Sequence, residues 1–371
     1  MMRIAFDARP LLGVRTGIGW CEAGQAAALI RQHPEDRFVL QGTALRHRTE
    51  LRAMLRPFVQ ENSALQLVPG SRFLPHAWQF GRNADVTHFF NYLVPAGVAG
   101  RTVVTVHDMV LHAHPETMHS RTRRLLRLRL RQSMARADRI VTDSAFSSRE
   151  IAKYYPAFAE KVRVVPCGVD LRQFCPVTDA DRLCDVRERY DTGERYFLYL
   201  GTLEPRKNLP RLISAYAAYA GCYQEPARLV LAGAWGWGFE EILQRIRALH
   251  LENSVVLTQY VAMEDLCALL SGALAFVYPS LYEGFGMPPL EAMACGTPVL
   301  VSDAASLPEV VGDCSLTVPA EDTVEIARGL CRLHEDAALR DRLSKAGRRR
   351  ASQFTWEHSA DRLYQVYREI A

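Results

Sequence analysis

Short apolar runs alternate with helical patterns along the first half of the chain. The longest helical patterns are Ser120–Ala137 and Ser147–Tyr155. Alternation of this kind is typical of a parallel sheet whose two faces are covered by helices. The apolar runs predict strands at Arg3–Asp7, Arg37–Gln41, Leu65–Pro69, Val86–Phe90, Thr102–His107, Arg139–Thr142 and Val162–Pro166.

The pattern breaks between Cys167 and Glu194, where the sequence is polar and has no clear period. We interpret this segment as the linker to a second domain, because the alternation restarts directly after it. Two similar α/β halves are therefore predicted. Helices are expected from Leu209, Phe239, Glu264 and Val324. Strands are expected at Tyr196–Leu200, Leu229–Ala232, Val255–Leu257, Leu274–Tyr278 and Pro298–Ser302.

The stretch Phe276–Val301 organises the second half. A strand leads into the glycine-bearing loop Glu283–Gly286, and two prolines then begin a helix. A glycine loop before a helix N-terminus offers backbone N–H groups and a positive dipole end to an anion. The same segment carries two acids, Glu283 and Glu291, in place of cations. A ligand with both phosphates and hydroxyls, such as a sugar nucleotide, would use both features.

Two adjacent cations, Arg206 and Lys207, follow the predicted strand Tyr196–Leu200. The carboxyl ends of parallel strands are where open α/β sheets bind ligands. An arginine fork beside a compact lysine charge suits a diphosphate. The alternative is a solvated pair at a helix start, although cations oppose the helix dipole there unless an anion compensates.

Two further strand ends in the first half carry groups with open interpretations. Gly17 and Gly19 lie between the first strand and a helix, so they form either a phosphate-binding turn or a tight structural turn. His107 and Asp108 end another strand. The histidine would either bind a sugar or simply hydrogen-bond Asp108 or a backbone carbonyl.

Neither set of metal-ligand residue types in the sequence fits a metal site. His112, His114 and His119 do not share one helix face, and the region is loop-like. Asp179 and Asp181 form a D-x-D pair, but they lie in the polar linker with no preceding strand. No metal is therefore expected.

The segment His119–Arg139 is dense in arginine and contains one acid, Asp138. A basic amphipathic helix favours an anionic membrane surface or a lipid-diphosphate acceptor, whereas the alternative is a solvated helix face. No aromatic residues are interleaved, so nucleic acid is not supported. The apolar stripe consists of Leu126, Leu130 and Met134. The candidate membrane or acceptor residues are Arg123, Arg124, Arg127 and Arg131.

Composition narrows the class of protein further. A chain of 371 residues with 49% hydrophobic and 23% charged residues suggests a globular two-domain protein with a mild net charge of +4. Nine cysteines without a C-x-x-C pair favour a reducing compartment. We find no signal peptide and no run of about 18 apolar residues. A cytoplasmic enzyme is expected.

Taken together, these motifs resemble those of the retaining glycosyltransferases of family 4. Their fold is GT-B, which is an α/β architecture of two Rossmann-like domains with parallel sheets facing across a cleft. The sequence of the E-x7-E motif looks most like the bacterial mannosyltransferase-like branch that builds O-antigen and other surface polysaccharides. The motifs that carry the resemblance are Thr16–Gly19, Val106–Asp108, Pro166–Asp170, Gly201–Asn208 and Glu283–Glu291.

The resemblance implies an N-terminal acceptor-binding domain over 1–170 and a nucleotide-sugar-binding domain over 171–355. A last helix, 356–371, would cross back to the N-terminal domain. Arg206 and Lys207 would hold the donor diphosphate, Glu283 the hydroxyls of the transferred sugar and Glu291 the ribose. His107 would lie by the sugar, and no metal or other cofactor would be needed. Further donor contacts would come from Gly17, Gly19, Tyr260, Gly284, Phe285, Gly286 and Met287.

The expected reaction is transfer of a hexose, with mannose from GDP-mannose as the first choice, to a lipid-linked or oligosaccharide acceptor at the inner face of the membrane. Cations and N–H dipoles would stabilise charge on the departing diphosphate. Glu283 would orient the sugar and not attack it covalently. A UDP-sugar donor is the first alternative, followed by a nucleotide-sugar hydrolase or epimerase and by a non-enzymatic binding subunit. An oxidoreductase is disfavoured, because neither half opens with G-x-G-x-x-G and a suitably placed acid.

Overall fold

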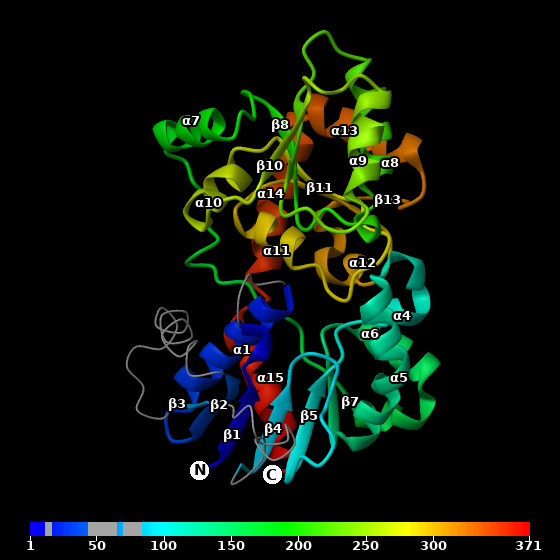
Figure 1. Cartoon of the computed structure of the whole chain (residues 1–371). Coiled ribbons are helices and arrows are strands. Elements are labelled where there is room, and N and C mark those ends of the chain that lie inside the picture. Colours follow the sequence, from blue (N-terminus) through cyan, green and yellow to red (C-terminus); the bar gives the residue numbers. More distant parts are fainter. Residues whose placement is uncertain (12–16, 44–64, 70–83) are drawn as a thin grey trace. The chain divides into compact units, whose positions relative to one another are not determined.

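The computed structural model describes residues 1–11, 17–43, 65–69 and 84–371 (Figure 1). These residues form two compact units. Unit 1 comprises Met1–Gly168 together with Phe354–Ala371, and unit 2 comprises Val169–Gln353. Each unit is built around its own parallel sheet.

The sheet of unit 1 has seven strands in the order β3-β2-β1-β4-β5-β6-β7, and each neighbouring pair is parallel. The strands lie where the apolar runs predict them, within about two residues at each end. They are β1 (Arg3–Asp7), β2 (Arg37–Thr43), β3 (Leu65–Pro69), β4 (Val86–Phe89), β5 (Arg101–Thr105), β6 (Arg139–Thr142) and β7 (Val162–Val164).

The last helix of the chain, α15 (Trp356–Arg368), packs against α1 (Gly17–Gln32) within unit 1, and the two lie side by side in Figure 1. Gly24 of α1 permits this approach, since a Cβ there would lie 2.3 Å from the Trp356 ring. Tyr367 anchors the other end with a 2.7 Å hydrogen bond between its hydroxyl and His88 Nδ1. Among its described residues, unit 1 also contains α4 (Val110–Ala113), α5 (Ser120–Arg136) and α6 (Ala145–Tyr154), with 3-10 turns η1 (Arg9–Leu11), η3 (Pro115–Thr117) and η4 (Pro156–Lys161).

The sheet of unit 2 has six parallel strands in the order β10-β9-β8-β11-β12-β13. Counted from the first strand of each unit, both sheets begin 3-2-1-4-5-6, the order of the doubly wound nucleotide-binding folds. The strands are β8 (Tyr196–Leu200), β9 (Arg228–Ala232), β10 (Val255–Gln259), β11 (Ala275–Tyr278), β12 (Val299–Ser302) and β13 (Leu316–Val318).

Helices cover the sheet of unit 2, with α8, α9 and α13 grouped together in Figure 1 and α11 packed on α14. The helices are α7 (Ala180–Arg189), α8 (Leu209–Ala220), α9 (Phe239–Ala248), α10 (Met263–Ser271), α11 (Met287–Ala294), α12 (Leu307–Val311), α13 (Thr323–Glu335) and α14 (Ala337–Ala351), with 3-10 turns η5 (Pro205–Lys207) and η6 (Gly312–Cys314).

Helix α7 corrects the expectation that the segment between the two halves is aperiodic throughout. Asp179 caps this helix by accepting hydrogen bonds from the backbone N–H groups of Asp181 and Arg182. Arg182 and Arg189 then reach the fully buried carboxylate of Asp265, at 2.5 and 2.7 Å. Ion pairs fix α7 on α10, and among the described residues of this helix only Val186 is fully buried. A search for hydrophobic periodicity misses a helix of this kind.

Candidate active site

The sheet of unit 2 reverses its strand order between β8 and β11, and the polar motifs follow these two strands. Arg206 and Lys207 lie in η5, directly after β8, and Glu283 lies in the loop after β11. Ligands of open α/β sheets bind at the carboxyl edge where the strand order reverses. The topology therefore brings the two motifs together at the binding edge of unit 2.

A buried carboxylate joins the two cations. Lys207 Nζ donates to Glu283 Oε1 at 2.6 Å, and Arg206 donates to Glu283 Oε2 at 2.8 Å. The hydroxyl of Tyr278 accepts from Lys207 at 2.8 Å, and Glu204 accepts from Arg206 at 2.9 Å. We call these five residues the Glu283 cluster.

From the sequence, the cations are expected to bind phosphate and the acids to bind hydroxyls. The Glu283 cluster differs from this expectation, because its acid also binds its cations. Lys207 and Glu283 are each only 7% exposed, so each charge needs a partner inside the protein. The structure supplies that partner by pairing the cations with Glu283 itself. The acid therefore holds the cations in place as well as standing at the binding edge.

The electrostatics of the cluster keep Glu283 ionised. Burial opposes ionisation, but the attraction of Arg206 and Lys207 outweighs it and lowers the pKa of Glu283 to about 2. Burial and repulsion from Arg206 lower the pKa of Lys207, and Glu283 offsets part of this shift. Glu283 is thus a charged hydrogen-bond acceptor at neutral pH and a poor proton donor.

The loop after Glu283 packs closely against the start of α12. Gly286 has φ of 114°, a left-handed conformation that favours glycine, and a Cβ there would lie 2.7 Å from Leu307. Ser306 donates to the carbonyls of both Glu283 and Phe285. Because prolines occupy positions 288 and 289, the first turn of α11 offers the N–H of Met287 but has none at the next two residues. The first turn of α11 therefore offers fewer backbone N–H groups to an anion than the sequence pattern suggests.

Glu291 lies one turn into α11 and is partly exposed. Within the part of the chain that the structure describes, its carboxylate makes no side-chain hydrogen bond or ion pair. Desolvation, together with the nearby Cys267, raises the pKa of Glu291 to about 7. An acid without a protein partner at this edge is suited to accept hydrogen bonds from ligand hydroxyls.

His107 lies in unit 1, just after β5, and its ring is fully engaged. Nδ1 is 2.6 Å from the Asp143 carboxylate, and Nε2 is 2.8 Å from the carbonyl oxygen of Phe90. Both partners are acceptors, so both ring nitrogens donate. Burial works against the charged ring, but Asp143 prevails and raises the pKa of His107 to about 10. Of the two interpretations left open by the sequence, these contacts match the backbone-carbonyl one, with Asp143 in place of Asp108.

Two cysteines complete the surroundings of His107. The sulfurs of Cys21 and Cys167 are 3.2 Å apart, and both residues are buried. Donor atoms of Cys21, His107 and Asp143 lie within 4.8 Å of one another, a set from which a metal site could be built. We call these four residues the His107 cluster. Asp143 and the Phe90 carbonyl already account for both nitrogens of the histidine.

The other predicted contacts are spread over both units. Tyr260 of unit 2 follows β10 at the carboxyl edge and is 71% exposed. Gly17 and Gly19 lie in the first turn of α1 in unit 1, whereas Thr16 of the same motif lies outside the described residues. Two contacts of the Glu283 segment were missed in the sequence, those of Tyr278 and Ser306. Of these two contacts, only that of Tyr278 could have been indicated by the sequence, through its position at the end of a strand.

Helix α5 has the amphipathic character expected from its sequence. Leu126, Leu130 and Met134 are buried in the core of unit 1. Arg123 is partly buried and donates to the carbonyl of Pro115. The exposed side carries Arg124, Arg127 and Arg131 together with two leucines, Leu125 and Leu128. Within the described residues, no helix is both long and apolar enough to span a bilayer.

Two doubly wound parallel units, one with an acid–cation cluster where its strand order reverses, define the class of GT-B glycosyltransferases. Comparisons with known proteins agree with this class. The family described as Glycosyl transferases group 1 matches residues 185–350, and the one described as Glycosyltransferase Family 4 matches residues 27–173. The chain is 34% identical to O-antigen chain mannosyltransferase B of Escherichia coli, over 79% of this chain and 76% of that protein. The chain belongs to glycosyltransferase family 4.

Two other similar proteins extend the comparison. O-antigen chain mannosyltransferase RfbU of Salmonella typhimurium is 31% identical over 59% of this chain and 57% of that protein. The structure of Anabaena Alr3699/HepE in complex with UDP and glucose superimposes with a TM-score of 0.77 and 20% identity, over the full length of both chains. At that identity the structural match supports the fold alone.

Proposed function

We propose that the chain is a retaining mannosyltransferase that moves mannose from GDP-mannose to a lipid-linked or oligosaccharide acceptor in surface polysaccharide synthesis. The observation that carries the proposal is the Glu283 cluster, in which two cations and a buried acid meet at the ligand-binding edge of unit 2. Mannose is favoured because the relatives that match at 30% identity or more include several mannosyltransferases.

The donor diphosphate lies against Arg206 and Lys207. Lys207 donates to Glu283 and Tyr278, which leaves a third ammonium proton for phosphate. As the bond between the sugar and the diphosphate breaks, negative charge grows on the leaving group. Cations held in place before the reaction stabilise that charge without reorganising, which lowers the barrier to transfer.

Glu283 orients the sugar and does not act as a covalent nucleophile. Its two oxygens are already hydrogen-bonded to Lys207 and Arg206, so each has lone-pair capacity left for a sugar hydroxyl but little freedom to attack carbon. Retention then follows from substitution on one face of the sugar, with the leaving diphosphate taking the acceptor proton. His107, the catalytic candidate of unit 1, acts as a fixed cation whose ring is held by Asp143 and the Phe90 carbonyl.

Glu291 accepts hydrogen bonds from the ribose hydroxyls, and the backbone at Gly284–Met287 contributes N–H groups. Tyr260 stands beside the nucleotide base. Arg206 and Lys207 stabilise the diphosphate by charge-assisted hydrogen bonds, and transfer proceeds without a metal ion or other cofactor.

The exposed side of α5 meets the anionic membrane that holds the acceptor. Leu125 and Leu128 are 41% and 67% exposed, and arginines flank them. Apolar tips among cations suit the interface of a bilayer with acidic headgroups. Binding to vesicles that contain phosphatidylglycerol is expected, with a clear reduction in Leu128→Glu. Equal binding of the variant would contradict this part of the proposal.

An acceptor-dependent assay tests the function. Release of nucleoside diphosphate is measured with GDP-mannose or a UDP-sugar, with and without a lipid-linked mannosyl acceptor. GDP release that requires the acceptor is expected. Release without acceptor would indicate a hydrolase. Turnover with the UDP-sugar but not with GDP-mannose would show that the donor is a UDP-sugar. A thermal-shift screen of GDP, UDP, ADP and dTDP provides a second readout, because a ligand at 100 times its Kd adds about 2.7 kcal/mol of stability.

A further inference from the structure

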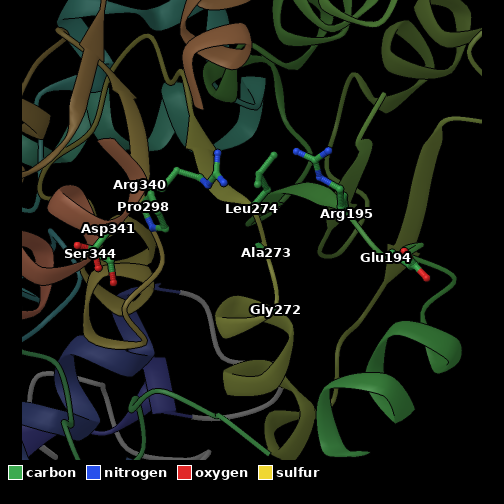
Figure 2. Close-up of a pocket in the computed structure, with 9 residues that line it drawn as sticks. All are labelled: Glu194, Arg195, Gly272, Ala273, Leu274, Pro298, Arg340, Asp341 and Ser344. Atoms are coloured by element: carbon green, nitrogen blue, oxygen red, sulfur yellow. The ribbon is translucent and has the colours of Figure 1, made fainter. Parts of the chain in front are cut away.

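A second pocket lies at the opposite edge of the sheet in unit 2. Arg195, Leu274 and Pro298 each come directly before a strand, namely β8, β11 and β12. The strands span roughly 15 Å at about 3.3 Å per residue, so this amino-edge pocket is separate from the Glu283 cluster. The pocket has a volume of about 330 Å³. It is lined by Glu194, Arg195, Gly272, Ala273, Leu274, Pro298, Arg340, Asp341 and Ser344 (Figure 2).

Two arginines of the amino-edge pocket have only carbonyl partners. Arg340 donates to the carbonyls of Leu333 and His334, at 2.7 and 3.0 Å, in the last turn of α13. Arg195 reaches the same His334 carbonyl at 3.4 Å. Neither guanidinium lies within 4.0 Å of a carboxylate oxygen in the described part of the chain.

Capping of α13 accounts for only one of the two arginines. A cation at the carbonyl end of a helix satisfies orphan acceptors and the dipole. Arg340 already does this with two shorter hydrogen bonds. Arg195 adds a single long one, is exposed and keeps most of its five N–H donors for another partner.

No carboxylate forms an ion pair with either guanidinium in the described residues, although Glu194 and Asp341 also line the pocket. Burial, then repulsion from Arg195, lowers the pKa of Arg340, and Asp336 offsets this only in part. Burial and the same two arginines lower the pKa of the adjacent His334. Figure 2 shows the two guanidinium groups on either side of the Leu274 side chain, whereas the Glu194 carboxylate points away from them.

We propose that the amino-edge pocket binds the phosphate group of a small phosphorylated metabolite. Arg195 and Arg340 hold the phosphate oxygens, and Ser344 also lines the pocket, beside Asp341. Leu274 and Pro298 provide an apolar surface for the remainder of the ligand. Phosphate is favoured over a carboxylate because it carries up to two charges and enough oxygens to accept from two guanidinium forks. A volume of about 330 Å³ is at the small end of ligand pockets, which suits a sugar phosphate.

Inorganic phosphate is the probe for this site. Its binding to the full chain is followed by calorimetry and by melting temperature, with chloride at equal ionic strength as the reference. Arg195→Gln should need about tenfold more phosphate for the same effect, corresponding to the loss of one charge-assisted contact. Arg342→Gln is the matched control, since it removes the same charge from an exposed position on α14.

Two further variants distinguish phosphate binding at the amino-edge pocket from binding at the Glu283 cluster and from a purely helix-capping role of Arg340. Arg206→Ala should keep phosphate binding at the amino-edge pocket, because it alters only the Glu283 cluster. Arg340→Lys preserves a charge that can cap α13 but removes the fork, so weaker phosphate binding in a folded protein is expected. The proposal is overturned if phosphate acts no differently from chloride, or if Arg195→Gln and Arg342→Gln bind phosphate equally.

Discussion

The Glu283 cluster and the His107 cluster both pair a buried carboxylate with a cation at the carboxyl edge of a parallel sheet, but they differ in what remains unused. In the Glu283 cluster, one acid is shared between two cations, and Lys207, which donates to Glu283 and Tyr278, retains a third ammonium proton. In the His107 cluster, one acid and one carbonyl take both donors of the ring. The first arrangement is built to receive an anion, and the second is built to hold a ring in one orientation and one charge state.

Removal of a cation from the Glu283 cluster should have the largest effect. Lys207→Ala or Arg206→Ala should lower kcat by about 10²–10³, the usual loss when a preorganised charge-stabilising donor is removed. Steady-state kinetics with GDP-mannose and acceptor measure this loss. Arg247→Ala, which removes an exposed arginine of α9, is the control and should be normal. Near-normal turnover of Lys207→Ala in a folded protein would contradict the assignment of Lys207 to the diphosphate.

A change in the His107 cluster should alter how activity and stability depend on pH. The folded pKa of His107, about 10, lies above the ordinary 6.5, so the stability it contributes is full below pH 6.5 and is lost as pH rises through 10. Asp143→Asn should return the pKa toward 6.5, so activity should decline above about pH 7, where the wild type stays level. The pH profile of kcat/KM and the melting temperature measure this.

Asp108 supplies the matched control for that variant. Its carboxylate bonds the Tyr92 hydroxyl and the Val110 backbone N–H, and not the His107 ring. Asp108→Asn should therefore leave the alkaline side of the profile unchanged. Identical profiles for Asp143→Asn and the wild type would show that the charge on His107 is not needed.

Glu291 should give a smaller effect on nucleotide binding. An acid with a pKa of about 7 is half ionised at neutral pH, and the carboxylate form accepts two hydroxyl donors. The Kd for GDP should tighten as pH rises from 6 to 8, whereas Glu291→Gln should bind about tenfold more weakly at pH 8, with a flatter profile. The exposed Glu252→Gln is the control. Parallel pH profiles for both variants would remove Glu291 from the ribose site.

Chelation should have the smallest effect. The His107 cluster contains donor atoms that a metal could use, but both His107 nitrogens and one Asp143 oxygen are already hydrogen-bonded. Among the side-chain nitrogen and oxygen atoms of these two residues, this leaves only the second Asp143 oxygen without a partner in the described residues. Activity should be unchanged after dialysis against a chelator, and metal analysis should find no stoichiometric ion. A loss of activity that Zn²⁺ or Mg²⁺ restores would overturn the proposal of metal-free transfer.

The sequence predicted the parts of the fold that depend on local pattern. Apolar runs located β1 and β8 to the residue, and the glycine and proline positions located the start of α11. It missed α7, whose stability comes from charges paired with Asp265, and the three-residue strand β13, which is too short for a periodicity argument. Elements that are stabilised by burial of apolar residues can be predicted from the hydrophobic pattern of the sequence, whereas elements that are stabilised by ion pairs between distant residues cannot.

The chemistry of the candidate site was predicted in its residue types but not in its contacts. The strand–loop positions of Arg206, Lys207 and Glu283 follow from sequence, and the strand order that unites them does not. Glu283 and Lys207 are 76 residues apart, and nothing local indicates that they share a hydrogen bond. The same holds for His107, where the adjacent Asp108 was the obvious partner and Asp143, 36 residues away, is the one observed.

The central claim is that the Glu283 cluster receives the nucleotide diphosphate, and calorimetric titration of GDP tests it most directly. Wild type, Arg206→Ala and Arg247→Ala are titrated under the same conditions. The account predicts GDP binding at one site per chain, weakened at least about tenfold in Arg206→Ala through loss of a charge-assisted contact, and unchanged in Arg247→Ala. Equal affinity of Arg206→Ala and the wild type would contradict it.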